Sequence, residues 1–243
     1  MENKEWEEYI IVSNEEINKN IYEIILEGEK INLEPGQFVN VRIPNKFLAR
    51  PFSIADYEKN RLHIVYKVVG SGTEILGKEK KGNLLKVLTG LGNGFDLEVP
   101  AKKPVLIGGG TGAAPIYYLA RKLLEKGINP EIILGFRREE ESIYLEKFKA
   151  LKKCLIAYET STNHPLVTDY LKELEDYDYF YACGPKPMLK AITNLSAKEG
   201  ELSLESRMAC GIGTCKCCSI ETEEGMKTLC KDGPVLKKKL VKW

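Results

Sequence analysis

Four cysteines near the carboxyl end of the chain have the spacing of a metal-cluster site. The pattern C-x4-C-x2-C-x11-C is formed by Cys210, Cys215, Cys218 and Cys230. Thiolates two to four residues apart on a turning backbone can converge on one centre, and Gly211 and Gly213 allow the positive φ angles that such a turn needs. A C-x4-C-x2-C run followed by a distant cysteine is typical of a plant-type [2Fe-2S] site.

Two other interpretations of these cysteines stay open. Structural zinc usually takes paired CxxC units, so the spacing favours [2Fe-2S] over zinc. A disulfide framework agrees poorly with an odd cysteine count and with the polar residues 1–8, which do not resemble a secretory signal. Cys217 is adjacent to Cys218 and points elsewhere if Cys218 is a ligand, so we expect it to be a spare thiol. Cys154 and Cys183 lie in apolar segments and are expected to be buried.

Two glycine-containing turns could receive a nucleotide. Gly108, Gly109, Gly110, Thr111 and Gly112 stand where a strand gives way to a helix, so backbone amides could approach a phosphate. The run is not GxGxxG, and a structural tight turn is the alternative. Cys183, Gly184 and Pro185 follow a later apolar strand, at the carboxyl edge of the same expected sheet, where open α/β sheets bind ligands.

A third set of residues suits a flavin. Arg50, Pro51, Phe52 and Ser53 combine forked donors for a pyrophosphate, a rigid backbone, an aromatic face and a hydroxyl for a ring nitrogen. Alone, such a tetrapeptide is more often an ordinary strand. A short helix expected from Thr73 to about Lys80, with Thr73 as its N-cap, would offer amides to an anion. No GxSxG, HExxH or P-loop occurs, so redox chemistry would belong to cofactors.

Three regions must position these residues. Residues 1–100 alternate short β-rich runs with turns and predict an antiparallel β-barrel. Residues 101–200 alternate strands and helices, including a helix from about Ala113 to Lys126, and predict a parallel α/β domain. Residues 201–243 lose regular periodicity and predict a small [2Fe-2S] module held by its metal. The predicted fold class is therefore multi-domain, β plus α/β.

Bulk composition excludes several classes of function. The chain has 243 residues, with 36 basic and 35 acidic side chains, so nothing global points to nucleic acid or to an anionic membrane. The uncharged stretch 104–120 contains four glycines, each costing about 1 kcal/mol in a helix interior, and does not predict a membrane span. The expected compartment is the reducing cytoplasm.

The order of the motifs resembles one known family. The order is RPFS, YKVVGSGT, GLGNGF, LIGGGTGAAP, ACGP, and then ESRMACGIGTCKCC with LCKDGP. It resembles that of the electron-transfer subunits of type B dihydroorotate dehydrogenase, in the ferredoxin reductase superfamily, over nearly the whole chain. In that superfamily another aromatic residue is common at the place of Phe52.

The resemblance implies a role for each motif. FAD would be held by Arg50, Pro51, Phe52, Ser53, Val65, Tyr66, Lys67, Gly72 and Thr73. NAD would be received by Gly108 to Gly112 and by Cys183, Gly184 and Pro185. The cluster ligands would be Cys210, Cys215, Cys218 and Cys230, with Cys217 outside the family pattern.

The resemblance also implies a partner and a path for electrons. Family members work with a catalytic subunit that carries FMN, typically as a heterotetramer, and dihydroorotate is oxidised in that partner. Electrons would pass from FMN through [2Fe-2S] and FAD to NAD⁺, in pyrimidine biosynthesis. A related subunit of an NAD(P)H:ferredoxin oxidoreductase or transhydrogenase complex is the alternative, and a zinc-stabilised nucleotide-binding module is the non-redox one. Arg137 and Arg138, followed by three glutamates, leave the choice between NAD and NADP open.

Overall fold

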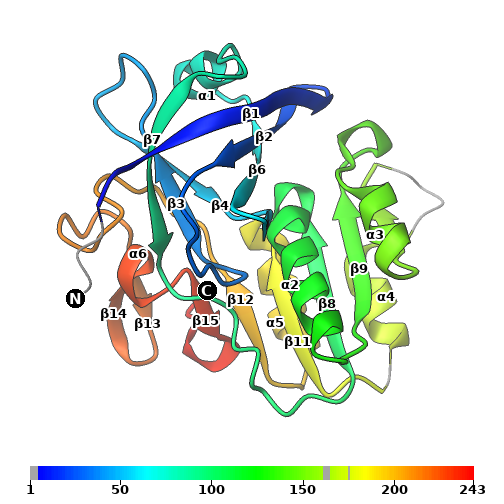
Figure 1. Cartoon of the computed structure of the whole chain (residues 1–243). Helices are drawn as coiled ribbons and strands as arrows, with labels where there is room; N and C mark the ends of the chain where they lie inside the picture. The colour runs from blue at the N-terminus through cyan, green and yellow to red at the C-terminus, as the bar shows by residue number, and fades with distance from the viewer. Residues whose placement is uncertain (1–4, 161–164, 175) are drawn as a thin grey trace.

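The computed structural model describes residues 5–160, 165–174 and 176–243, which form two large sheets and a hairpin (Figure 1). The expectation about the start of the chain falls partly on residues 1–4, which lie outside the described residues. The first sheet is antiparallel, with the order β4-β3-β7-β1-β2-β6-β5. Its strands are β1 (Glu7–Asn18), β2 (Ile21–Glu27), β3 (Phe38–Val41), β4 (Arg50–Ser53), β5 (Asp56–Glu58), β6 (Arg61–Lys67) and β7 (Leu84–Leu91). Because β4 also contacts β6, the sheet curls toward a barrel, as predicted.

The second sheet is parallel except at one edge. Its order is β10-β9-β8-β11-β12-β15, and only β15 runs antiparallel to its neighbour. The strands are β8 (Pro104–Gly109), β9 (Glu131–Phe136), β10 (Leu155–Tyr158), β11 (Tyr179–Cys183), β12 (Gly200–Ser203) and β15 (Val235–Lys237). Every residue of β8 and β11 is buried, as expected for central strands covered on both faces.

Helices cover both faces of this sheet, which confirms the α/β prediction (Figure 1). Alternate strand residues face opposite sides: Leu106 and Tyr181 share a core with α2 (Ala113–Glu125), whereas Val105 and Phe180 share one with α5 (Lys186–Leu195). The first face also carries α3 (Leu145–Leu151) and the second α4 (Val167–Glu173). The longest helix, α2, spans 13 residues. Among the described residues, no helix combines the length and apolarity needed to cross a membrane.

The carboxyl-terminal segment does not stand apart from the nucleotide sheet. Strands β12 and β15 extend that sheet, so strand pairing joins it to the region from residue 201 onward, which we expected to form a small [2Fe-2S] module. Between them lie the cysteine loop, the hairpin β13 (Ser219–Thr222) with β14 (Gly225–Thr228), and α6 (Leu229–Asp232). Both ends of the cysteine segment are therefore anchored in the sheet that also carries the turn from Gly108 to Gly112.

Two local predictions were wrong in detail. Helix α1 spans Ser71–Leu76, and its N-cap is Gly70. Thr73, expected as the N-cap, lies inside the helix, and its hydroxyl accepts the amides of Val69 and Gly70 at 3.0 and 3.3 Å. This hydroxyl accepts hydrogen bonds from two backbone amides at the start of the helix while Thr73 itself lies in the first turn. The helix can therefore begin before Thr73, and Thr73 is not its N-cap.

One carboxylate joins the barrel to the nucleotide domain. Glu23, on β2, accepts hydrogen bonds from His63 Nδ1 at 3.0 Å and from Lys147 Nζ at 2.8 Å, and also from the Tyr144 hydroxyl. Burial opposes ionisation of Glu23, but the bonds from His63, Lys147 and Tyr144 outweigh it and lower its pKa to about 2. Since Tyr144 and Lys147 belong to the α3 region, this cluster fixes how the two domains face each other.

Candidate functional site

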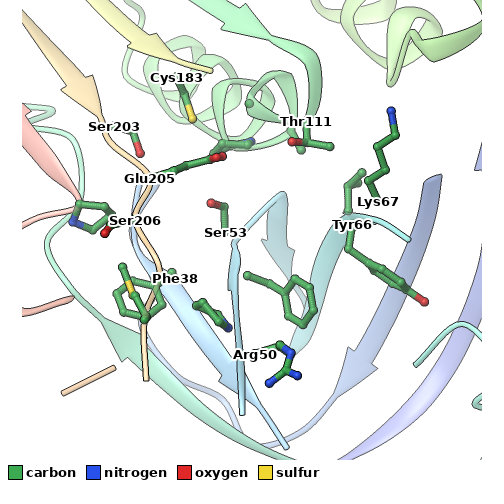
Figure 2. Close-up of a pocket in the computed structure, with 18 of the residues that line it drawn as sticks. Phe38, Arg50, Ser53, Tyr66, Lys67, Thr111, Cys183, Ser203, Glu205 and Ser206 are labelled. Carbon is green, nitrogen blue, oxygen red and sulfur yellow. The ribbon is translucent and has the colours of Figure 1, made fainter. Parts of the chain in front are cut away.

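A cleft of about 380 Å³ lies where the barrel, the nucleotide domain and residues 203–208 meet (Figure 2). Most of the residues predicted to bind cofactors line it: Arg50, Pro51, Phe52, Ser53, Val65, Tyr66, Lys67, Thr73, Thr111, Gly112 and Cys183. The predicted residues that do not line this cleft are Gly72, Gly108, Gly109, Gly110, Gly184 and Pro185. The fold thus brings together residues that are far apart in the sequence.

Strand β4 forms one wall of the cleft. It is the edge strand of the barrel sheet and pairs only with β3, so one side of its backbone is free for a ligand. The Arg50 side chain lies against the first turn of α1, where a Cβ on Gly72 would be 2.9 Å from Arg50 Nε. Glycine at position 72 therefore lets the guanidinium and the first turn of α1 face the same space, a combination that suits a pyrophosphate.

Strand β6 presents alternate side chains to different surroundings. Val65 belongs to the core that includes α2, whereas Tyr66 belongs to the barrel core. The Tyr66 hydroxyl donates to Asn14 Oδ1 at 2.9 Å and points away from the cleft (Figure 2). Lys67 is exposed and pairs with Glu141 of the nucleotide domain at 3.1 Å. Tyr66 therefore contributes ring packing and backbone to this wall, and its hydroxyl serves the barrel.

The glycines of the turn from Gly108 to Gly112 differ in whether a side chain would meet neighbouring atoms. A Cβ on Gly112 would lie 2.4 Å from the carbonyl oxygen of Cys183, and one on Gly108 would lie 2.8 Å from Ala113 Cα. Gly112 is therefore required by close packing against the turn from Cys183 to Pro185, and Gly108 by close packing against the start of α2. Gly110 differs, because it has a φ of 53° and nothing lies within 4 Å of where its Cβ would be. Its backbone is the part of the turn that a phosphate can approach.

Cys183, Ser53 and Glu205 gather around the middle of the cleft (Figure 2). Burial, together with the charge of Glu205, raises the pKa of the Cys183 thiol to about 12, so this group stays protonated at neutral pH. Glu205 keeps contact with solvent in the cleft, yet desolvation by the surrounding protein raises its pKa. The centre of the cleft thus holds a neutral thiol, a hydroxyl and one carboxyl group.

The four predicted cluster ligands lie as two pairs. The thiols of Cys210 and Cys215 interact, and so do those of Cys218 and Cys230. Each sulfur accepts a backbone amide: Cys210 from Cys215 at 3.4 Å, Cys215 from Cys217 at 3.5 Å, Cys230 from Gly213 at 3.0 Å and Cys218 from Cys230 at 3.4 Å. Sulfur atoms that accept amides are suited to the thiolate state. The arrangement fits a group with two metal ions, each taking two thiolates.

The two pairs differ in exposure and in pKa. Cys218 and Cys230 are 1% and 3% exposed, whereas Cys210 is half-buried and Cys215 is exposed. Partial burial raises the pKa of Cys210, but the amides of Cys215 and Ile212 lower it more strongly, to about 6. Burial, together with the Cys218 thiol, raises the pKa of Cys230 to about 12. One side of the site is therefore packed into the protein and the other reaches the surface.

The geometry also bears on the other interpretations of the cysteines. All seven cysteines lie within the described residues, and none forms a disulfide. In the part of the chain that the structure describes, no group of three or more His, Cys, Asp or Glu side chains is placed to hold a metal ion, so the preference for [2Fe-2S] over zinc rests on the cysteine spacing. The Cys217 thiol is directed to the carbonyl oxygen of Arg207 at 3.7 Å, away from the four sulfur atoms.

Sequence reasoning missed several residues of the cleft: Phe38, Ser203, Glu205, Ser206, Met208 and Pro234. The signal available was the ESRM segment directly before Cys210, which carries Glu205, Ser206 and Met208. Phe38 had no such signal. It is 3% exposed, lines the cleft, and shares an apolar core with Cys218 and Cys230.

Comparisons with known proteins agree with this architecture. The family model of the iron-sulfur cluster binding domain of dihydroorotate dehydrogenase B matches residues 205–242, and that of the oxidoreductase NAD-binding domain matches residues 106–194. A solved structure of an NADH-dependent reduced ferredoxin-NADP oxidoreductase is similar with a TM-score of 0.86 and 28% identity, over 100% of this chain and 92% of that one. A phthalate dioxygenase reductase shares the fold, with a TM-score of 0.68 and 21% identity over 78% of this chain and 64% of that one.

Curated relatives are more similar in sequence. The dihydroorotate dehydrogenase B (NAD(+)) electron transfer subunit of Caldanaerobacter subterraneus subsp. tengcongensis is 39% identical over 236 residues, covering 93% of this chain and 94% of the relative. The subunit of the same description from Fusobacterium nucleatum subsp. nucleatum is 36% identical over 247 residues, covering 94% and 95%. With this identity along nearly the whole length, the chain belongs to the family of dihydroorotate dehydrogenase B electron transfer subunits.

Proposed function

We propose that this chain carries electrons from the FMN of a partner dihydroorotate dehydrogenase catalytic subunit to NAD⁺, in pyrimidine biosynthesis. One observation carries the proposal: Phe38 lines the cleft formed by the flavin-type residues and packs in the same apolar core as Cys218 and Cys230. A flavin in the cleft and a cluster on the cysteines would therefore border the same apolar core.

The residues present fit both groups. When bound, a [2Fe-2S] cluster exchanges single electrons, and FAD combines two of them for hydride transfer to NAD⁺. Arg50 and the first turn of α1 would bind the FAD pyrophosphate, while the free edge of β4, with Phe52 and Ser53, would hold its ring system. Gly110 would admit the NAD pyrophosphate, and Cys183 would stand beside the nicotinamide. The corresponding regions are residues 1–100 for FAD, 101–200 for NAD and 201–243 for the cluster.

The cluster residues also suggest where electrons enter. Cys210, Cys215, Cys218 and Cys230 would be the ligands, with Cys217 outside the set. The loop from Gly211 to Lys216 would face the partner, because Cys215 and Ile212 are exposed there, Ile212 by 52%. The buried pair, Cys218 and Cys230, would hold the side of the cluster that faces the protein interior. The proposed assembly is a heterotetramer of two electron transfer and two catalytic subunits in the cytoplasm, in keeping with seven cysteines that form no disulfide.

A pair of cysteine variants tests this function. In the complex with its catalytic partner, Cys215→Ser is expected to abolish NADH formation from dihydroorotate, while NADH still reduces the bound FAD. Cys217→Ser is the matched control, since it removes a neighbouring exposed thiol that is not a ligand, and it should keep the coupled activity. Dihydroorotate-dependent NADH formation and the bleaching of flavin absorbance are measured for both. Retained coupling in Cys215→Ser would contradict the assignment.

The structural likeness to the ferredoxin-NADP oxidoreductase supports a second candidate, in which the same cleft serves a subunit of a bifurcating or transhydrogenase complex. The partner separates the two. Copurification with an FMN-containing barrel protein favours the first proposal, and copurification with a large subunit that carries several [4Fe-4S] clusters favours the second. Stoichiometric zinc with neither iron nor flavin in the purified protein would contradict both.

A further inference from the structure

A buried amide connects the barrel to the first predicted cluster ligand. Asn40 lies in β3 and is 2% exposed, one of the few buried polar side chains of the barrel. Its Nδ2 donates to the carbonyl oxygen of Cys210 at 3.3 Å. These two residues are 170 positions apart in the sequence, so the bond joins separate regions of the chain.

The strand that contains Asn40 is β3, which pairs with β4, the strand that forms one wall of the cleft and is called the flavin wall below. Asn40 pairs with Pro51 of β4 on one side and with Leu88 of β7 on the other. Phe38, two residues earlier, lines the cleft. A displacement of the Cys210 peptide relative to Asn40 would therefore be a displacement of the cluster relative to the flavin wall.

The contact leaves no room for an extra atom. A Cβ on Gly211 would lie 2.0 Å from Asn40 Nδ2, and Gly211 has a φ of 71°. Glycine directly after the first ligand is thus needed both for the left-handed turn and for the approach of the amide. Asn40 and Gly211 are therefore in close contact next to Cys210, the first member of the Cys210 and Cys215 pair.

We infer that Asn40 is a positioning residue for the cluster, holding the Cys210 peptide at a fixed place against the flavin-binding strand. The inference rests on the proposed function, because it requires that the four cysteines bind [2Fe-2S]. Hydrogen bonds to the groups that carry metal ligands orient those ligands, and their removal typically lowers metal affinity about 10- to 100-fold. The amide also places a fixed N–H dipole next to a ligand peptide, where it contributes to the potential of the cluster.

Asn93 offers a matched control. It is another asparagine at the junction of the barrel and the carboxyl-terminal segment, and it exchanges two hydrogen bonds with Val235, at 2.9 and 3.1 Å. It contacts none of the predicted ligands through these bonds. Asn93→Ala therefore removes a junction contact, from a more exposed side chain, without touching the cluster loop.

The experiment compares Asn40→Ala with Asn93→Ala in the anaerobically purified full chain with its partner. Iron per chain, the electron paramagnetic resonance spectrum of the reduced cluster, and the rate of iron loss to a chelator are measured. We expect Asn40→Ala to keep FAD, to change the spectrum, and to lose iron about tenfold faster than wild type. Asn93→Ala should keep the wild-type spectrum and rate, whatever its effect on thermal stability. Asn40→Thr, which conserves volume and suits a strand but lacks the reach, replaces Asn40→Ala if that variant does not fold.

Each outcome decides the inference. A changed spectrum and faster iron loss in Asn40→Ala or Asn40→Thr alone support it. Wild-type spectra and rates in the Asn40 variants, or equal changes in the Asn93 control, overturn it and leave the proposed function standing. Wild-type protein that binds no iron overturns both the inference and the proposed function.

Discussion

Glycines in the turn from Gly108 to Gly112 are needed for different physical reasons. At Gly112 the obstacle to a side chain is the backbone of Cys183, which cannot move without disturbing β11. At Gly110 there is no obstacle, only a left-handed φ of 53° and open space. Gly112 is therefore required by packing, whereas Gly110 leaves open space beside the backbone, where we propose that the NAD phosphate lies.

This difference gives a prediction for two alanine variants. Gly110→Ala should raise the KM for NADH about tenfold, because the added methyl group occupies the path of the phosphate. It should cost only about 1–2 kcal/mol of stability, from the left-handed φ. Gly112→Ala should instead lower the free energy of unfolding by about 1–3 kcal/mol or prevent folding. Flavin reduction by NADH and urea unfolding measure the two effects. Equal KM values for Gly110→Ala and wild type would contradict the role of Gly110.

Tyr66 gives a second prediction at this scale. Its hydroxyl bonds to Asn14, and its ring lies 5.6 Å from that of Phe52. Tyr66→Phe keeps the ring and removes the bond, so it should cost about 1 kcal/mol of stability and leave the FAD content unchanged. Flavin absorbance per chain and chemical unfolding check this result. Loss of FAD in Tyr66→Phe would mean that the hydroxyl contacts the flavin.

Between elements, the Glu23 cluster makes the junction of barrel and nucleotide domain sensitive to acid. A carboxyl group whose pKa is lowered on folding stabilises the folded state above its unfolded pKa, and this contribution is lost as the pH falls through the folded pKa. For Glu23 the loss should occur between about pH 4.5 and pH 2 and should reach about 3 kcal/mol. The groups that face Glu23 are His63 on β6, Lys147 on α3 and the Tyr144 hydroxyl directly before α3.

Glu23→Gln should therefore be less stable than wild type at pH 7, and the difference should shrink as the pH falls toward 2. Urea unfolding across this range measures it. Glu27→Gln is the matched control, because Glu27 lies on the same strand, is 45% exposed and pairs with Arg61 at the surface. Its effect should be small at every pH. If the difference in unfolding free energy between Glu23→Gln and wild type did not depend on pH, Glu23 would not be an ionised carboxylate in the folded protein.

The elements that the sequence predicted well are those whose periodicity is decided locally. The helix expected over 113–126 is observed as α2, Ala113–Glu125, and ends before Gly127, whose φ is 79°. Helix α3 was missed because it spans only 7 residues, and Tyr144 precedes it with a left-handed φ of 57° in place of a Ser, Thr, Asp or Asn cap. Strands β12 and β15 were missed because three or four residues become a strand only when a neighbouring sheet edge pairs with them.

At the scale of the whole molecule, motifs with fixed spacing predicted many of the residues that line the cleft. The sequence did not predict the contacts that distant parts of the chain make across it. Arg50, Ser53, Cys183 and the four cysteines carry local patterns. Glu205 is marked only by the ESRM segment before Cys210, and Phe38 carries no local pattern, since a single aromatic residue gains its place only from the fold. Asn40 is the clearest case, because its bond to Cys210 depends on the packing of two regions that no local pattern connects.

The way the cysteine segment is anchored leads to a last prediction. Strands β12 and β15 belong to the nucleotide sheet, whereas the loop between Ser206 and Ser219 has little regular structure of its own. If metal holds this loop, removing iron should leave both sheets and FAD reduction by NADH intact and open only the loop. Trypsin should then cut at Arg207 and Lys216 about tenfold faster or more than in the iron-loaded chain. Cleavage at Lys19, in the turn between β1 and β2, should not change and serves as the internal control.

Mass spectrometry of timed digests distinguishes the outcomes. Equal cleavage at Arg207 and Lys216 with and without iron would show that the loop is held by the polypeptide, and uniform cleavage along the chain would show that the metal supports the whole fold.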